Sequence, residues 1–219
     1  GSRAGEVMMK RVRVCAAAVT CGWLVAGMLV GALDAARVGE PAPAFTATDS
    51  RGQSHALADY AGKFVVLEWH NFGCSYVKKH YAGHMQQMQK EWTGKGVVWL
   101  TVISSGPGQQ GFLKPEEANG FLKDRGASPT ALLLDTDGVV GTLFDVKTTP
   151  QVYVIAPDGT VIYTGAVDSK PTTDAGDIPA ATNYLAAALT EALGGKPVTT
   201  PTTRPYGCSV KLAPATPRK

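Results

Sequence analysis

Residues 63–90 read KFVVLEWHNFGCSYVKKHYAGHMQQMQK, and this stretch decides the fold. The continuous apolar run over residues 64–69 predicts a strand that is covered on both faces. Apolar side chains recur at helical spacing over residues 75–92, so one helix is expected there after a short turn. Cys74 stands where the turn becomes the helix. A helix start favours a thiolate through its unpaired N–H groups and its dipole, which makes Cys74 a candidate nucleophile.

Three neighbours bear on this interpretation. Lys78 adds positive potential in the first turns of the helix, and Val77 occupies the position at which a C-x-x-C motif carries its second thiol. Glu68 is a carboxylate within an apolar strand, so it needs a buried partner or a raised pKa and is a candidate general acid or base. In the plainer alternatives, Cys74 is a small buried apolar residue and Glu68 reaches water at the strand end.

The first 36 residues predict an export signal or a membrane anchor. Lys10, Arg11 and Arg13 precede an uncharged run over residues 14–33, as in export signals. This run is long for a cleaved signal and long enough for an anchor, so both alternatives stay open. Because the basic flank stays inside, the rest of the chain is expected outside the cytoplasm, in the periplasm or another extracytoplasmic compartment.

A chain of 219 residues that is 44% hydrophobic suits one globular domain with appendages. We expect a domain over residues 37–195 and a Pro/Thr-rich tail over residues 196–219, either extended over the domain or disordered. The net charge of +3 conceals a domain with more acidic than basic residues, so no surface suited to nucleic acid is expected. No cofactor and no metal site is predicted.

The remaining patterns predict an α/β fold with a central mixed sheet flanked by helices. A hairpin over residues 44–57 precedes the strand at 64–69, and the next strand, 97–103, is expected to pair with it in parallel through a right-handed crossover. Further strands are predicted at residues 131–134, 151–156 and 161–165, and further helices at residues 115–126, 139–144 and 179–193.

Several motifs of this sequence occur together in one known family. They are Glu68-Trp69-His70-Asn71, Cys74, Val77, Lys79-His80-Tyr81, GVVWL at residues 96–100, Thr148-Thr149-Pro150 and YGCSVK at residues 206–211. With these motifs, the stretch from Val38 to Lys211 resembles the exported bacterial peroxiredoxin-like redoxins related to AhpC/TSA. The resemblance implies a thioredoxin-like fold and a redox chemistry at Cys74.

The resemblance also implies roles for individual residues. In that fold a cis proline faces the nucleophilic cysteine, and the residue before it binds substrate as an added strand. Pro150 and Thr149 match these two positions, and Glu68 matches a buried acid that assists proton transfer. Asn71 takes the substrate-side position at which peroxidases of the superfamily carry Thr or Ser, which argues against peroxidase activity. Ser75 replaces the proline that usually follows the cysteine.

The expected function is that of an exported thiol-based oxidoreductase. Cys74 would attack a protein disulfide or a small peroxide, a second thiol would resolve the product, and an unidentified reductant would complete turnover. Downstream of the leader, the sequence offers only Cys208 as that second thiol. The chain from Gly195 to Cys208 spans about 45 Å at most, enough to cross the domain. A Cys74–Cys208 disulfide would be either part of turnover or a permanent structural staple.

Two alternatives from other functional classes stay open. A copper-handling module would combine Cys74 with a nearby histidine, His70, His80 or His84, as thioredoxin-fold copper chaperones pair a cysteine with a distant histidine. A fold that only binds peptides would leave Cys74 inert. A thiol with a low pKa favours the enzyme, whereas tight Cu(I) binding favours the copper-handling module.

Overall fold

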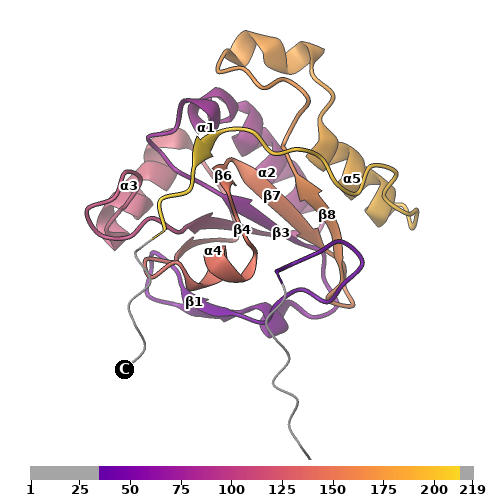
Figure 1. The fold of residues 1–219 in the computed structure, drawn as a ribbon, viewed down its shortest axis with the longest axis horizontal. Helices are drawn as coiled ribbons and strands as arrows, with labels where there is room; N and C mark the ends of the chain where they lie inside the picture. Colours follow the sequence, from indigo (N-terminus) through magenta and orange to yellow (C-terminus); the bar gives the residue numbers. More distant parts are fainter. Residues whose placement is uncertain (1–34, 213–219) are drawn as a thin grey trace, which may run out of the picture. The chain divides into compact units, whose positions relative to one another are not determined.

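The computed structural model describes residues 35–212. These residues form a five-stranded mixed sheet and the elements that cover it (Figure 1). Its strand order is β5 (Ala131–Leu134), β4 (Val98–Ile103), β3 (Val65–Trp69), β7 (Gln151–Ile155) and β8 (Val161–Gly165). The three strands β5, β4 and β3 are parallel, β7 runs antiparallel to β3, and β8 runs antiparallel to β7 and so in the direction of β3. The predicted mixed sheet and the parallel pairing across the first crossover are both confirmed.

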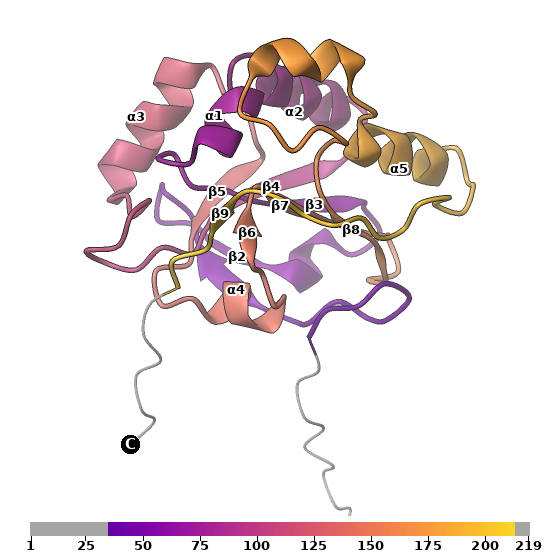
Figure 2. The same cartoon turned by 45° about the horizontal axis from the view of Figure 1, so that its top comes forward.

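Helices cover one face of this sheet, and shorter elements cover the other. In Figure 2 the first layer lies above the sheet and the second below it. The first layer consists of α1 (Ser75–His80), α2 (His84–Gly94), α3 (Pro115–Arg125) and α5 (Tyr184–Leu193). The second consists of the hairpin β1 (Thr46–Thr48) and β2 (Ser54–Ala56), the short helical turn η1 (Leu57–Tyr60) and α4 (Val139–Leu143).

The side-chain alternation of β3 explains why its apolar run is continuous. Val66 packs in the cluster of α1, α2 and α5, whereas Leu67 and Trp69 pack in the opposite cluster with Phe144 of the segment after α4. All five residues of β3 are buried. A strand whose two faces are both covered carries apolar residues at every position, and Glu68 is the one exception within β3.

Two predicted helices have the wrong boundaries. The helix expected over residues 75–92 is interrupted between α1 and α2, where Gly83 has a φ of 130°, a conformation that glycine adopts at no steric cost. The helix expected over residues 179–193 begins only at Tyr184, because Asn183 caps it by accepting a hydrogen bond from the Ala186 N–H. Pro179 lies instead in the separate 3-10 segment η2 (Ala175–Ala180).

The tail lies extended across the domain, which is the first of its two predicted alternatives. Its last strand, β9 (Cys208–Ser209), pairs antiparallel with β6 (Thr148–Thr149), and both views show the two strands side by side. Upstream, Thr202 bridges to Thr164 of β8. Residues 1–34 of the predicted leader lie outside the described residues. No helix within residues 35–212 is long and apolar enough to cross a membrane.

Candidate active site

Cys74 occupies the N-cap position of α1, at the end of the turn that follows β3. Its N–H donates to the Asn71 carbonyl oxygen at 2.9 Å. The Asn71 side chain holds the turn as well, since Oδ1 accepts from the Gly73 N–H at 2.9 Å and Nδ2 donates to the Gln110 carbonyl at 3.2 Å. Asn71 is buried and lies in the turn that carries Cys74, with its amide engaged by backbone groups.

The Cys74 thiol faces the segment before β7. It is 1% exposed, and its Sγ lies 3.1 Å from the Thr149 carbonyl oxygen, to which the thiol donates. The Thr149-Pro150 peptide bond is cis. The predicted cis bond and its closeness to Cys74 are therefore confirmed.

Cys208 also lies next to Thr149. In the β6–β9 pair it stands directly opposite Thr149, whose hydroxyl donates to the Cys208 carbonyl at 3.5 Å. Cys208 is half-buried and packs against the cluster that contains Cys74. Both cysteines are free thiols. The two thiols that the sequence predicts to react with each other are thus neighbours, in the reduced state.

The two thiols differ in acidity because one donates a hydrogen bond to the other. Burial raises the pKa of Cys74, but hydrogen bonds from the Cys208 thiol and from the N–H groups of Val77 and Cys208 outweigh it and leave that pKa below its ordinary value. Burial, the hydrogen bond to Cys74 and the charge of Cys74 raise the pKa of Cys208 to about 11. Cys74 is therefore the more acidic thiol of the pair and the stronger nucleophile.

Glu68 is fully buried and surrounded by neutral donors. Its carboxylate accepts hydrogen bonds from the Tyr81 hydroxyl at 3.0 Å, the Thr101 hydroxyl at 2.9 Å, the Trp99 indole at 3.1 Å and the Gln89 amide at 3.4 Å. The buried partner that its position requires is thus a set of four uncharged groups. A role of Glu68 in proton transfer stays a prediction.

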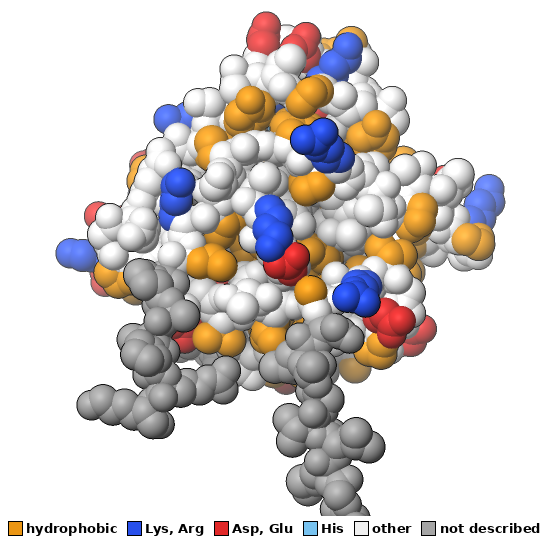
Figure 3. Space-filling view, viewed as in Figure 1, with side chains coloured by type: hydrophobic (Ala, Val, Ile, Leu, Met, Phe, Trp, Pro, Cys, Tyr) orange, Lys and Arg blue, Asp and Glu red, His pale blue; other side chains and the backbone are white. Residues whose placement is uncertain are grey.

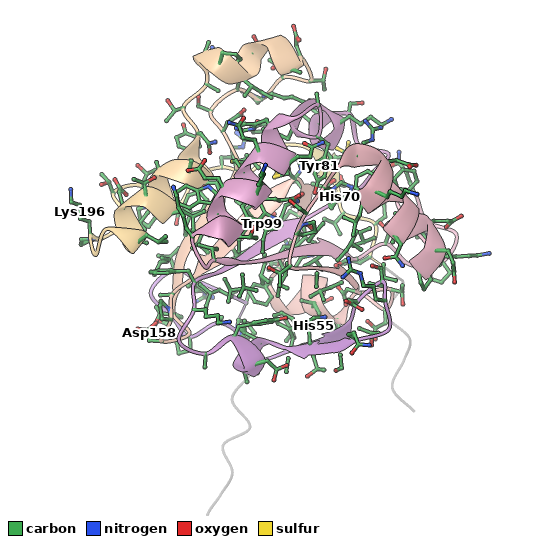
Figure 4. The ribbon with its side chains drawn as sticks, turned by 180° about the vertical axis from the view of Figure 1, so that it is seen from behind. His55, His70, Tyr81, Trp99, Asp158 and Lys196 are labelled. Carbon is green, nitrogen blue, oxygen red and sulfur yellow. The ribbon has the colours of Figure 1, made fainter. Side chains whose placement is uncertain are left out.

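His70 lies beside this network. Its Nδ1 is 3.5 Å from the Glu68 Oε1, and neither ring nitrogen has a hydrogen-bond partner. The ring packs against Tyr81 and Phe121, with centroids at 4.6 and 4.8 Å. Figure 4 shows His70 and Tyr81 side by side between the helices and the sheet. Nowhere in residues 35–212 are three or more His, Cys, Asp or Glu residues grouped so as to hold a metal ion.

A second buried polar cluster joins α1 to the tail. The Lys79 ammonium, fully buried, donates to Asp168 at 3.2 Å and to the Lys170 carbonyl at 2.7 Å. The Tyr206 hydroxyl donates to Asp168 and lies 3.4 Å from both Lys79 Nζ and His80 Nε2. In the sequence, Lys79 and Tyr206 stood out only as parts of motifs, and His80 also as a candidate copper ligand. Asp168 was missed, because no sequence spacing links it to them.

The charges in this cluster are settled by burial and by hydrogen bonds. Burial raises the pKa of Asp168, but hydrogen bonds from Tyr206, from the Lys170 N–H and from the Lys79 ammonium outweigh it and lower that pKa. Burial lowers the pKa of His80 to about 4, despite the opposing charge of Asp168. At neutral pH the cluster therefore contains an ionised Asp168 and a neutral His80.

The chain is similar in sequence to known proteins. The model of the AhpC/TSA family matches residues 38–164. The thiol-disulfide oxidoreductase ResA of Bacillus subtilis is 26% identical over 151 residues, which cover 69% of this chain and 77% of ResA.

Two solved structures share the fold. An uncharacterised conserved protein from Geobacillus kaustophilus superposes with a TM-score of 0.70 at 25% identity, covering 82% of this chain and 94% of that one. A hypothetical protein from Sinorhizobium meliloti has a TM-score of 0.68 at 19% identity, covering 82% and 97%. At these identities the two structures inform on the fold alone.

Proposed function

The chain belongs to the AhpC/TSA family, and from this premise we propose that it is a thiol-disulfide oxidoreductase whose nucleophile is Cys74. The observation that carries the proposal is the pair of free thiols, Cys74 and Cys208, that meet at Thr149. The similarity to ResA supports the same class of reaction. Thiol-disulfide exchange needs an acidic attacking thiol and a second thiol that resolves the mixed disulfide, and Cys74 and Cys208 match these two roles.

In the first step, the Cys74 thiolate attacks one sulfur of a substrate disulfide. The substrate S–S bond breaks, a mixed disulfide with Cys74 forms, and the departing sulfur leaves as a thiolate that takes up a proton from solvent. The lowered pKa of Cys74 keeps a larger fraction of this thiol ionised near neutral pH than in an ordinary cysteine.

In the second step, Cys208 attacks Cys74. Two of the causes that raise the pKa of Cys208 come from Cys74, namely its hydrogen bond and its charge. Both disappear once Cys74 is in a mixed disulfide, so the pKa of Cys208 falls when its thiolate is needed. The attack releases the substrate as a thiol and leaves a Cys74–Cys208 disulfide. Two electrons have then passed to the substrate, and an external dithiol restores the reduced enzyme.

Asn71 favours disulfide over peroxide as the substrate. Both polar atoms of its side chain bond to the backbone of the surrounding loops, and a Cβ on Gly111 would lie 2.6 Å from its amide. An amide held in this way shapes the turn. Unlike the Thr or Ser that peroxidases carry at this position, it provides no hydroxyl to hold a peroxide. We therefore place peroxidase activity second to thiol-disulfide exchange.

We propose that the chain works outside the cytoplasm. The support is the basic flank and the uncharged run of residues 1–36. Free thiols in an oxidising compartment need a reductant or a protected site. Cys74 is buried beneath the tail, which gives that protection.

Trapping the mixed disulfide tests the proposed function. Cysteines 15 and 21 are first replaced by serine, so that only the two site thiols react. With a small aromatic disulfide, Cys208→Ser should accumulate an adduct that peptide mapping assigns to Cys74, whereas the parent should proceed to the Cys74–Cys208 disulfide. Cys74→Ser should form neither product at a comparable rate. An adduct that forms first on Cys208, or an unreactive Cys74, rejects the assignment.

A further inference from the structure

The tail occupies the edge at which a substrate strand would pair. Strand β9 lies on β6 with Cys208 opposite Thr149, and Cys74 beneath it is 1% exposed. A partner strand that brought its own cysteine to Cys74 along Thr149 would need the same hydrogen-bonding edge. The docked tail and an external strand therefore exclude each other.

The position before Cys208 accepts glycine alone. Gly207 has a φ of 147°, and a Cβ built there would lie 2.6 Å from the Thr149 carbonyl carbon and closer still to its oxygen. The clash is with backbone atoms of Thr149 and Pro150, so no side-chain movement relieves it. Any strand that docks in this register therefore needs glycine immediately before its cysteine.

Tyr206 lies two residues before Cys208, and its hydroxyl enters a buried polar cluster. That hydroxyl donates to the buried Asp168 and lies 3.4 Å from the buried Lys79 ammonium. The Tyr206 ring packs edge-on against Tyr76 at 5.7 Å. A site whose buried charged groups bond a hydroxyl discriminates against a ligand that lacks it, because those groups lose a partner.

The tail is anchored upstream of these positions. Thr203 donates from its N–H to the Thr164 carbonyl at 3.1 Å, and its hydroxyl bonds to Tyr163 at 2.7 Å and accepts from the Ala166 N–H at 2.9 Å. Release of β9 therefore requires movement only of the residues after Thr203. A hollow of about 550 Å³ beside them, lined by Thr148, Asp168, Ser169, Arg204, Tyr206 and Gly207, gives an incoming strand room for its flanking side chains.

We propose that the segment Tyr206-Gly207-Cys208 is a tethered mimic of the substrate, and that this site selects partner polypeptides that present Tyr-Gly-Cys in an extended strand. The proposal rests on the proposed function. In Figure 3, which shows the face that the tail crosses, Lys and Arg side chains lie apart and form no patch. Recognition is therefore assigned to the strand register and the tyrosine site, and charge contributes little.

The probe is a peptide copying residues 203–212, with its cysteine activated as a mixed disulfide to a chromogenic thiol. Full-length Cys208→Ser protein, with cysteines 15 and 21 replaced by serine, is mixed with this peptide, and release of the chromogenic thiol is followed. Peptides with Gly207→Ala or Tyr206→Phe should react more slowly, the first by at least about tenfold and the second by about threefold to tenfold. Equal rates for all three peptides would overturn the selectivity.

The docked tail is tested on the protein side. Adding Gly207→Ala to the full-length Cys208→Ser protein should weaken tail docking and speed its reaction with the unaltered peptide by about tenfold. Gly120→Ala is the matched control, because nothing lies within 4 Å of a Cβ at that position, and it should leave the rate unchanged. If Gly207→Ala has no effect, the tail is not a competitor. If the full-length Cys208→Ser protein fails to react even with a small aromatic disulfide, the proposed function itself is rejected.

Discussion

Cys208 stands directly opposite Thr149, the residue that precedes the cis proline and whose carbonyl oxygen lies 3.1 Å from the Cys74 sulfur. One short strand pair thus brings together a candidate nucleophile, a candidate resolving thiol and the edge on which a substrate would pair. This arrangement also sets the acidity of Cys74.

Replacing Cys208 by alanine should raise the pKa of Cys74. The thiol of Cys208 donates one of the hydrogen bonds that lower this pKa, and alanine removes the donor. Cys208→Ser is the matched control, because serine keeps a hydrogen-bond donor at that position. The measurement is the pH dependence of Cys74 alkylation by iodoacetamide, in protein with cysteines 15 and 21 replaced by serine. An alanine variant that titrates like the parent would show that Cys208 does not stabilise the thiolate.

Glu68→Gln should destabilise the fold by about 1–3 kcal/mol. The substitution replaces a carboxylate oxygen, which accepts hydrogen bonds from groups such as the Tyr81 and Thr101 hydroxyls, with an amide NH₂ that can only donate. Urea unfolding measures the free-energy change. Glu91→Gln is a suitable control, since Glu91 forms an exposed pair with Lys95, and it should cost less than about 0.5 kcal/mol. If Glu68 also assists proton transfer, the folded variant should turn over more slowly. Unchanged stability would mean that the network contributes little.

Lys79→Met should cost about 3–5 kcal/mol, since it leaves the buried Asp168 carboxylate without its cation. The comparison is Lys147→Met, which removes an exposed pair with Asp145 and should change the stability by less than about 0.5 kcal/mol. Thermal or urea unfolding distinguishes the two. Similar losses in both variants would contradict the role given to the buried pair.

The protein should lose stability as the pH falls from about 6.5 toward 4. Folded His80 has a pKa of about 4, against about 6.5 in the unfolded chain, so the unfolded state binds the proton first in this window. The full contribution is about 3 kcal/mol. Its charged and titratable neighbours are Asp168, Lys79, His84 and Glu68, and the pKa of His84 is lowered in the same direction.

The His80 contribution is isolated by comparison with His80→Gln. Urea unfolding of this variant between pH 7 and pH 4 should show a shallower loss of stability than the parent. Replacing the half-exposed His84 by Gln should remove a smaller part of the slope, because less of that ring is buried. Parallel pH profiles for the parent and His80→Gln would refute the assignment.

Local patterns predicted most of the fold. The apolar runs gave the strands, and the helix boundary at Cys74 is within one residue of the expected position. The break at Gly83 was missed because Met85, Met88 and Trp92 continue the helical spacing across it. Periodicity reports which side of the sheet a residue faces, and two consecutive helices on the same face leave nearly the same pattern.

The site was predictable only where motifs reached it. Cys74, Thr149 and Cys208 could be paired through the family resemblance, and the structure brings them together. The contact of Lys79 with Asp168 joins residues 89 positions apart, and it depends on how the segment after β8 folds back over α1. No local sequence pattern predicts a contact between residues so far apart, so the polar site for Tyr206 is visible only in the three-dimensional structure.

The place of β9 after all the other described strands also sets the order in which this site is assembled during synthesis. Cys74 and Thr149 leave the ribosome long before Cys208, and domains begin to fold as they emerge. Until β9 arrives, the nascent domain therefore carries an uncovered reactive thiol with no resolving partner. Cys15 and Cys21 are already synthesised by then. A chaperone or a reducing environment that acts on the unfinished chain would keep Cys74 from pairing with them before its own partner exists.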